Sequence, residues 1–308
     1  MNGSARQRSV LHELVLAWFD REGRDLPWRH AEATAWGIYV SEVMAQQTPI
    51  ARVLPVWQQW MQHWPEPAAL AAQPPGVAIQ AWHRLGYPRR ALRLHAAARV
   101  MVERHDGQVP ATYAELLELP GVGAYTAAAV YAFAFGGRAT VVDTNVRRVL
   151  TRIVLGRALP AQSLTRAEQD LATDMLPTSD SDSVRWNVAA MELGALVCTA
   201  RSPHCERCPA AGQCGWLQAG RPAYAGPPRP GQGWVGTDRQ IRGTILAALR
   251  ERAGPLPAST VLASWPSEPE RAARCLAGLV ADGLVERLPQ SEVSLPGLGN
   301  HADIDSGG

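Results

Sequence analysis

The stretch "LELPGVGAYTAAAV", from Leu117 to Val130, places two glycines around one valine between two segments of helical pattern. Glycine lets a chain turn sharply, and because it has no side chain a ligand can approach the backbone closely. Amide N–H groups at the start of the following helix, helped by the helix dipole, can hold a phosphate group. Gly121 and Gly123 therefore mark either an ordinary interhelical turn or a backbone site for an anion.

The chain on both sides of this turn is patterned for helices. Apolar residues recur at helical spacing from Val10 to Phe19, and Gly23 ends that pattern. Short stretches such as Ala139–Val142 are the only ones that look extended. Helices are also expected at 36–47, 49–63, 76–85, 88–105, 112–117, 124–135, 143–155, 163–175 and 181–196. The sequence thus predicts an all-α protein.

The composition changes after residue 220. Residues 221–236 are too rich in proline and glycine to pack as a helix, so we expect a linker. Beyond it the pattern predicts three short helices, and "LVERLPQSEVSLP" (Leu284–Pro296) is typical of a small hairpin. The helices are expected at 238–252, 258–264 and 269–282. We expect a winged-helix-like module at 237–296 and a disordered tail at 297–308.

The charge of the chain is nearly balanced. The formal net charge is +2, and all 30 basic side chains are arginine, so a mechanism that needs a lysine amine is excluded. The polar start does not resemble a signal peptide, and no apolar run reaches the length of a membrane span. We expect a soluble protein of the cytoplasm that associates with the nucleoid and has no membrane partner.

Four of the five cysteines cluster between residues 198 and 214, with the spacing C-x6-C-x2-C-x5-C. Clustered cysteines in a cytosolic chain bind metal more often than they form disulfides. A structural zinc site is usually built from two short cysteine pairs, and this loop has only one, so the spacing favours a cubane cluster over zinc. The expected ligands are Cys198, Cys205, Cys208 and Cys214.

This cysteine loop and the turn "LPGVGAYT" together resemble the endonuclease III-like helix-hairpin-helix DNA glycosylases. The resemblance runs from about Arg6 to Gly220. It implies a six-helix domain at 29–137, beside a cluster domain formed by the N-terminal helix (1–28) and residues 138–220. It also implies a [4Fe–4S] cluster on the four cysteines. A monovalent cation, usually potassium, would bridge the hairpin at Gly121 and Gly123 to a DNA phosphate.

Two carboxylates carry the chemistry that the resemblance implies. Asp143 directly precedes a helix, where aspartate is a preferred cap. In the superfamily an aspartate at this position stabilises or transiently attacks the sugar cation, and Asn145 matches a residue that orients it. Glu42 has apolar neighbours that favour its protonated form, although a lone helical glutamate is usually exposed. The segment "YVSEVMAQQT" resembles the adenine-glycosylase branch, in which such a glutamate protonates the purine.

Further segments resemble DNA-contacting parts of the family. "GRDLPWR" (Gly23–Arg29) resembles the entry to the adenine pocket, and "RLGYPRRALRLHAAA" (Arg84–Ala98) resembles the wedge that enters the duplex. Aromatic residues there could equally be core. Tyr125 occupies the position of the Schiff-base lysine of bifunctional members and is expected near the carboxylates. The implied substrate and DNA contacts are Arg24, Leu26, Trp28, Arg29, Gln47, Thr48, Tyr87, Gly121 and Gly123.

The expected protein is a monomeric, monofunctional glycosylase that excises adenine opposite 8-oxoguanine or guanine from double-stranded DNA, without lysine-dependent lyase activity. A thymine glycosylase for G:T mispairs is an alternative, although Gln46 and Gln47 stand where that branch tends to have basic residues. A non-catalytic iron–sulfur DNA-binding protein is another. The resemblance fails beyond the linker, because the Nudix-like domain of the best-known adenine glycosylases, which reads 8-oxoguanine, has no counterpart here.

Overall fold

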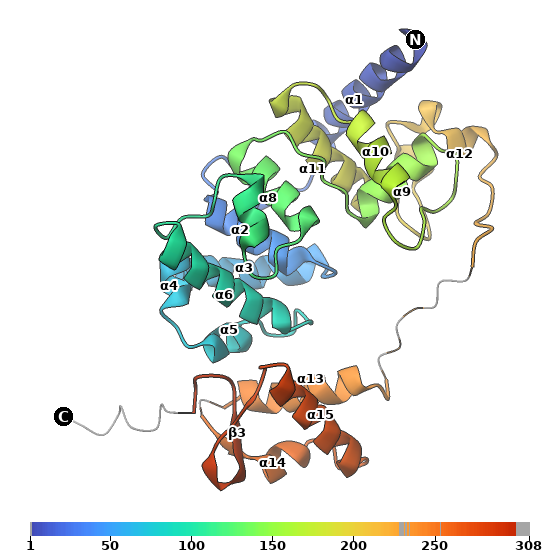
Figure 1. Cartoon of the computed structure of the whole chain (residues 1–308). Coiled ribbons are helices and arrows are strands. Elements are labelled where there is room, and N and C mark those ends of the chain that lie inside the picture. Colours follow the sequence, from blue (N-terminus) through green and yellow to red (C-terminus); the bar gives the residue numbers. More distant parts are fainter. Residues whose placement is uncertain (1, 228–230, 232, 234, 253, 300–308) are drawn as a thin grey trace. The chain divides into compact units, whose positions relative to one another are not determined.

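The computed structural model describes residues 2–227, 231, 233, 235–252 and 254–299. Helices dominate this part of the chain, so the predicted all-α fold is confirmed (Figure 1). The chain divides into two compact units, one of residues 1–38, 111–118 and 122–228 and the other of residues 39–110, 119–121 and 229–308. Each unit is described by itself, and the domain boundaries expected from the sequence stay predictions.

The first unit packs its longest helices around one apolar core. Helices α1 and α9 both pack on α11, and Val15, Val149 and Leu193 from these three helices are almost completely buried (Figure 1). The ring of His12 packs edge-on against Trp186 at 4.6 Å. The elements are α1 (Asn2–Glu22), η1 (Pro27–Arg29), α7 (Tyr113–Glu118), α8 (Ala124–Phe135), α9 (Thr144–Ile153), α10 (Arg166–Asp174), α11 (Asp180–Leu196), η2 (Cys205–Arg207), η3 (Ala211–Gln213) and α12 (Gly215–Gln218).

The second unit begins within α2 and is organised around tryptophan. Trp60 is buried, its ring packs edge-on against Trp64 and Trp82, and its indole N–H donates to the carbonyl oxygen of Ala81 at 2.9 Å. This bond satisfies the one polar atom of a large apolar side chain. The helices are α2 (Ala35–Ala45), α3 (Ile50–His63), α4 (Pro67–Ala71), α5 (Pro75–Ala81) and α6 (Arg89–Arg104).

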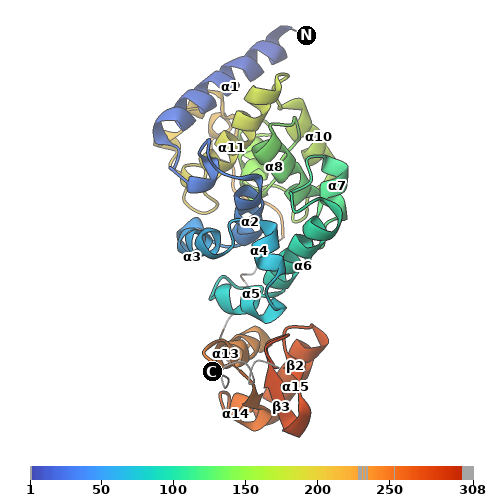
Figure 2. The same ribbon diagram turned by 90° about the vertical axis from the view of Figure 1, so that its left-hand side faces the viewer.

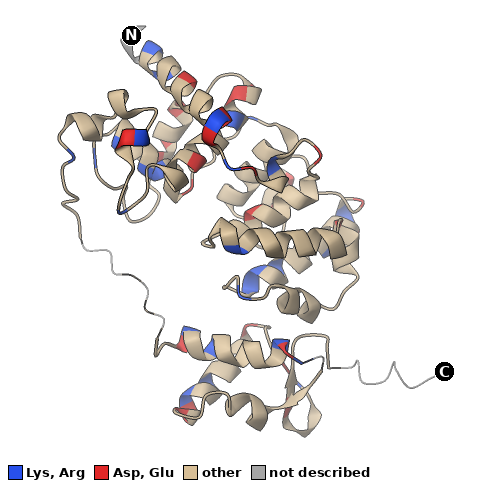
Figure 3. Cartoon of the chain, turned by 180° about the vertical axis from the view of Figure 1, so that it is seen from behind, with Lys and Arg blue, Asp and Glu red and all other residues tan. Residues whose placement is uncertain are grey.

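The C-terminal part of the second unit is the expected winged-helix-like module. Helices α13 (Asp238–Arg250), α14 (Ala258–Leu262) and α15 (Pro269–Ala281) stand beside a small antiparallel sheet (Figure 2). The strands β1 (Leu256–Pro257), β2 (Glu286–Arg287) and β3 (Glu292–Ser294) have the order β1–β3–β2. Val293 pairs with Leu256 on one side and Arg287 on the other. Basic and acidic residues are interspersed along the module, which carries seven arginines and seven acids over 237–296 (Figure 3).

The predicted linker and the predicted tail differ in the structure of their described residues. The described residues of the predicted linker contain no helix or strand. The predicted tail begins at Gly297, yet residues 297–299 are held in place, because the amides of Gly297 and Gly299 donate to Glu286 and Leu298 is buried. Residues 300–308 lie outside the described residues. Across the residues that the structure covers, no helix combines the length and apolarity needed to cross a membrane.

Candidate active site

The two glycines of the hairpin have different environments. Gly121 has a φ of +80°, and a Cβ added there would lie 2.6 Å from Cδ of Arg93. Gly123 caps α8 with a φ of −107°, and a Cβ there would meet no described atom within 4 Å. The fold therefore requires glycine at position 121. At position 123 the missing side chain instead leaves the backbone at the start of α8 open.

Asp143 is the N-cap of α9, which is the usual role of an aspartate directly before a helix. Its Oδ1 accepts the backbone N–H groups of Asn145 at 2.8 Å and Val146 at 2.7 Å, and its Oδ2 accepts the side-chain amide of Asn145 at 2.7 Å. Burial raises the pKa of the Asp143 carboxyl, while these hydrogen bonds and the nearby Arg148 oppose the rise. Both carboxylate oxygens are thus held in one orientation before any ligand arrives.

Asn145 is held in turn by Arg148. The guanidinium donates to Oδ1 of Asn145 at 2.6 Å and to the carbonyl oxygen of Cys198 at 2.6 Å. Helix α11 approaches closely enough for this only because residue 194 is glycine, where a Cβ would lie 2.6 Å from Cβ of Asn145. A continuous chain of hydrogen bonds thus joins Asp143 to the first cysteine of the predicted cluster loop.

Tyr125 lines a cavity of about 500 Å³ in the first unit. Val142, which precedes Asp143, lines the same cavity, together with residues of α7, α8 and the segment that leads to α10. Tyr125 thus shares a cavity with Val142, the residue before Asp143, and its predicted place near the carboxylates stays a prediction.

Glu42 lies on α2, where the second unit begins. Only 8% of the residue is exposed, and its neighbours Val40, Val43 and Met44 are equally buried or more so. The apolar setting expected from the sequence is present, and the solvent-exposed alternative is wrong.

Arg24 and Arg29 both bind Glu192, a residue that the sequence reading missed. Arg24 donates to both oxygens of the Glu192 carboxylate, at 2.6 and 2.8 Å, and Arg29 donates to one of them at 2.8 Å. Glu192 is 1% exposed. Burial alone would raise its pKa, but the hydrogen bonds from the two arginines outweigh that effect and lower the pKa to about 2. These contacts fix the segment that holds the buried side chains of Leu26 and Trp28.

The two predicted wedge residues, Gln47 and Tyr87, both have left-handed backbones, with φ of +54° and +48°. One buried arginine, Arg90, binds both loops. Its guanidinium donates to the carbonyl oxygens of Val43 and Met44 at the end of α2, of Gln46 just after it, and of Leu85 and Gly86 in the loop before α6. It also donates to Oγ1 of Thr48, which is itself buried. Burial lowers the pKa of Arg90 to about 10. Arg90 was not singled out from the sequence, because it stands in an arginine-rich stretch.

The four clustered cysteines lie within electrostatic reach of one another. Burial and the other three thiols raise the pKa of Cys208 to about 11, against a backbone hydrogen bond from Ala210. Arg152 donates to Sγ of Cys198 at 3.3 Å, so a cation lies beside a group that metal binding would make anionic. Among the described side chains, no group of three or more His, Cys, Asp or Glu is placed to hold a metal ion.

A family model of HhH-GPD superfamily base excision DNA repair proteins matches residues 40–172. The adenine DNA glycosylase of Mycobacterium tuberculosis (strain H37Rv) is 46% identical over 293 residues, which cover 95% of each chain. The chain belongs to the adenine DNA glycosylase family of this superfamily. It is therefore a DNA glycosylase of base excision repair, as the sequence predicted.

Other relatives match different lengths of this glycosylase. The Mycolicibacterium smegmatis adenine DNA glycosylase is 46% identical and covers 92% of the chain, whereas the human enzyme is 43% identical over 65% of the chain and 38% of its own length. A solved thermostable thymine-DNA glycosylase is 28% identical, with a TM-score of 0.62 over 70% of the chain and 99% of its own. An endonuclease III–DNA complex at 23% identity and a TM-score of 0.59 shows the fold alone.

Proposed function

We propose that the glycosylase removes adenine mispaired with 8-oxoguanine or guanine in double-stranded DNA, acting as a monomer. The observation that carries this proposal is the 46% identity to adenine DNA glycosylases over 95% of both chains. The buried Glu42 and the pre-oriented Asp143 supply the two groups that the reaction needs. Those groups are a proton donor for the leaving base and an anion for the developing sugar cation.

In the proposed reaction, Glu42 donates a proton to N7 of the adenine. The bond between C1′ and the base then breaks, and its electron pair leaves with the adenine. Asp143, held by Asn145, stabilises the positive charge that develops on the sugar until water adds to C1′ and loses a proton. Tyr125, which lines a cavity with Val142, would lie near these carboxylates, and because the chain has no lysine no Schiff base with the sugar follows.

The remaining predicted contacts serve to bind DNA in this proposal. Gln47 and Tyr87 would enter the duplex from the two loops that Arg90 anchors, and Thr48 would support the first of them. Leu26 and Trp28 would form the base pocket on the segment that Glu192 fixes through Arg24 and Arg29. Gly121 and Gly123 of the hairpin would hold a monovalent cation, which would supply positive charge for a DNA phosphate.

A [4Fe–4S] cluster would be held by Cys198, Cys205, Cys208 and Cys214. The donor set fits this group, since four thiols influence one another's ionisation and Arg152 lies beside one of them. Each cysteine of a cubane binds its own iron, so the four sulfurs need not converge on a single ion as they do around zinc. When bound, the cluster supplies iron–thiolate bonds that close the loop from residue 198 to residue 214.

The test is a single-turnover assay on duplexes that contain A opposite 8-oxoguanine. We expect Asp143→Asn and Glu42→Gln each to lower the excision rate at least 100-fold, on the order expected for loss of an acid–base group. Asp170→Asn, which removes an exposed acid of α10, is the control and is expected to match the wild type. Wild-type rates in either active-site variant would overturn the proposal.

The thymine alternative keeps one observation in its favour, which is the 28% identity to a solved thymine-DNA glycosylase. A panel of A:8-oxoguanine, A:G and G:T duplexes separates the two activities. Faster release of thymine than of adenine would favour the alternative, and base release from none of the duplexes would favour a non-catalytic DNA-binding protein.

A further inference from the structure

The C-terminal module is fastened to the loop that carries Tyr87, here called the wedge loop (Arg84–Pro88). Asp282, directly after α15, accepts hydrogen bonds from Arg89 at the start of α6 and from Arg242 of α13. The Asp282 carboxylate therefore binds two arginines, one from α6 and one from the C-terminal module. Arg89 follows Tyr87 by two residues in the sequence.

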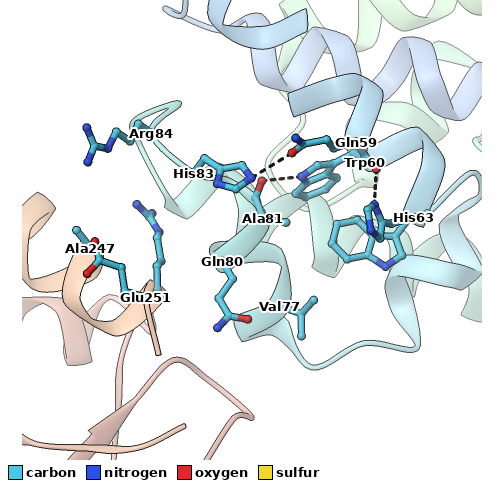
Figure 4. Close-up of a pocket in the computed structure, with 12 residues that line it drawn as sticks. Gln59, Trp60, His63, Val77, Gln80, Ala81, His83, Arg84, Ala247 and Glu251 are labelled. Carbon is cyan, nitrogen blue, oxygen red and sulfur yellow. Dashed lines mark hydrogen bonds between the residues drawn. The ribbon is translucent and has the colours of Figure 1, made fainter. Parts of the chain in front are cut away.

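A second contact holds the other end of α13. Arg250 donates through Nε to the carbonyl oxygen of Ile79 at 3.0 Å, and burial lowers its pKa to about 10. A cavity of about 510 Å³ is lined there by residues of α3 and α5, by Ala247 of α13 and by Glu251 directly after that helix (Figure 4). Helix α13 thus extends from the wedge loop to α5 and is held at both ends.

The first turn of α13 places Arg239 over the ring of Tyr87. The guanidinium carbon of Arg239 lies 4.7 Å from the ring centroid, and that of Arg90 lies 5.6 Å from it. Tyr87 is 37% exposed. Its backbone is left-handed, and Gly86 before it has a φ of +80°. An exposed aromatic ring on a strained loop needs neighbours to keep one orientation. Arg90 comes from the catalytic part, and Arg239 comes from the module.

We propose that Arg239 is a positioning residue that holds the ring of Tyr87 ready to enter the duplex, so that the C-terminal module takes part in excision through the wedge. This inference rests on the proposed function, in which Tyr87 is the wedge. A planar guanidinium suits the role because it stacks on an aromatic face and carries little hydration. The module carries equal numbers of basic and acidic residues. General attraction of the module to phosphates would therefore not explain a loss of excision activity when Arg239 alone is changed.

The similarity of the relatives agrees with a working role for the module. The match to the M. tuberculosis enzyme omits at most 15 of the 308 residues, so it extends through most of the 60-residue module. The human enzyme matches only 65% of the chain. The module therefore belongs to the same protein architecture as the catalytic part in the mycobacterial relatives.

The experiment is a double-mutant cycle on the full chain, with Arg239→Ala, Tyr87→Ala and the double variant in the single-turnover assay. A cation–π contact at an exposed site is worth about two- to fivefold in an equilibrium constant, so we expect Arg239→Ala to lower the excision rate by about that factor. The same change in the Tyr87→Ala background should have no further effect. Arg274→Ala on α15 removes an exposed arginine of the same module and is expected to match the wild type.

A second readout separates positioning from folding. 2-Aminopurine placed beside the target adenine becomes brighter when its stacking is broken, and we expect Arg239→Ala and Arg239→Gln to reduce that increase while leaving the thermal unfolding midpoint unchanged. Additive losses in the cycle, or an unchanged fluorescence increase, would overturn the role of Arg239. A wild-type excision rate in Tyr87→Ala would instead remove the wedge assignment on which the inference rests, while adenine excision itself stays established by the same assay.

Discussion

At Gly121 the backbone is left-handed and the aliphatic part of Arg93 lies against the α-carbon, whereas at Gly123 neither constraint is present. We expect Gly121→Ala to lower the free energy of unfolding by about 1–3 kcal/mol, because strain and overpacking add. Gly123→Ala should change it by less than about 1 kcal/mol and weaken DNA binding, since a methyl group would enter the open backbone site. Urea unfolding and fluorescence anisotropy with a duplex measure the two effects. Equal destabilisation by both changes would contradict this account.

The buried carboxylate of Glu192 gives a second prediction at the residue scale. Its pKa is about 2 in the folded chain against an ordinary 4.5, so its ionised form stabilises the fold above pH 4.5. That contribution, about 3 kcal/mol by linkage, is lost as the pH falls from 4.5 towards 2. Glu192→Gln should therefore be less stable at pH 7, and its stability should vary less between pH 4.5 and 2. Unfolding in urea across this range is the measurement.

Asp20→Asn is the matched control for that experiment. Asp20 pairs with Arg185 of α11, the helix that carries Glu192, but both partners are about half exposed. An exposed pair contributes about 0–1 kcal/mol, so this variant should follow the wild type at every pH. A pH dependence in Glu192→Gln as steep as that of the wild type would show that other groups cause the acid instability.

Single residues of the site differ in how readily they can be predicted from the sequence. Asp143 before a helix and Glu42 among apolar residues were predicted, because capping and burial leave local signals in the sequence. Glu192 and Arg90 were not, because the arginines that bind Glu192 lie more than 160 positions away, and Arg90 is one of several arginines in its stretch, with its partners at the end of α2 more than 40 positions away. No pattern within one helix reveals such a partner.

At the scale of elements, Arg90 joins the end of α2 to the loop before α6 through hydrogen bonds to five carbonyl oxygens. We expect Arg90→Lys to lower the free energy of unfolding by about 2–4 kcal/mol, because a single ammonium group cannot reach the same acceptors. Hydrogen exchange should rise at residues 43–48 and 85–88 more than elsewhere. Arg99→Lys, at an exposed position of the same helix, is the control.

Hydrogen exchange at residues 43–48 and 85–88 decides whether Arg90 anchors these two segments specifically. If exchange rises evenly over the second unit in Arg90→Lys, then Arg90 stabilises the fold in general and does not act as an anchor of the two loops. Restored protection in the presence of a duplex would show that DNA contacts can replace the anchor.

Helix boundaries show the same limit of local patterns. Helix α1 begins at Asn2, well before the apolar pattern at Val10, because its first turns are polar and leave no periodic signal. The predicted helix at 76–85 ends at Ala81, since His83 has a φ of +46°. The short helix α4 was missed, because five residues are too few for a periodicity to be read.

For the whole molecule, the absence of lysine makes a prediction about the product. Treatment with sodium borohydride during turnover should trap no covalent complex between the glycosylase and DNA, because no lysine amine is present to form an imine. The strand should stay intact until alkali cleaves the abasic site. Denaturing gels with and without alkali measure this, and a bifunctional member of the superfamily is the positive control. A trapped complex would contradict the assignment of a monofunctional enzyme.

The arrangement of whole units was the hardest feature to predict. The second unit combines residues 39–110 with residues 229–308, and it includes Leu119–Gly121 from the hairpin. A module after the linker could be predicted, because the amino-acid composition of the chain changes there. The sequence held no sign that this module would pack on α5, since that packing depends on surfaces far apart in the chain.

The hydrogen bond from the amide of Gly76 to the carbonyl oxygen of Pro296, at 2.7 Å, joins residues 220 positions apart. A ribosome that adds about 5–20 residues per second needs about 10–40 s to make the second partner after the first. Throughout that interval the nascent chain holds α5 without the surface that covers it, while residues 111–118 and 122–228 of the first unit are synthesised in between. The segment around Pro296 therefore completes a unit whose other large part, residues 39–110, is synthesised much earlier, and a premature stop codon after the linker would leave that unit permanently unfinished.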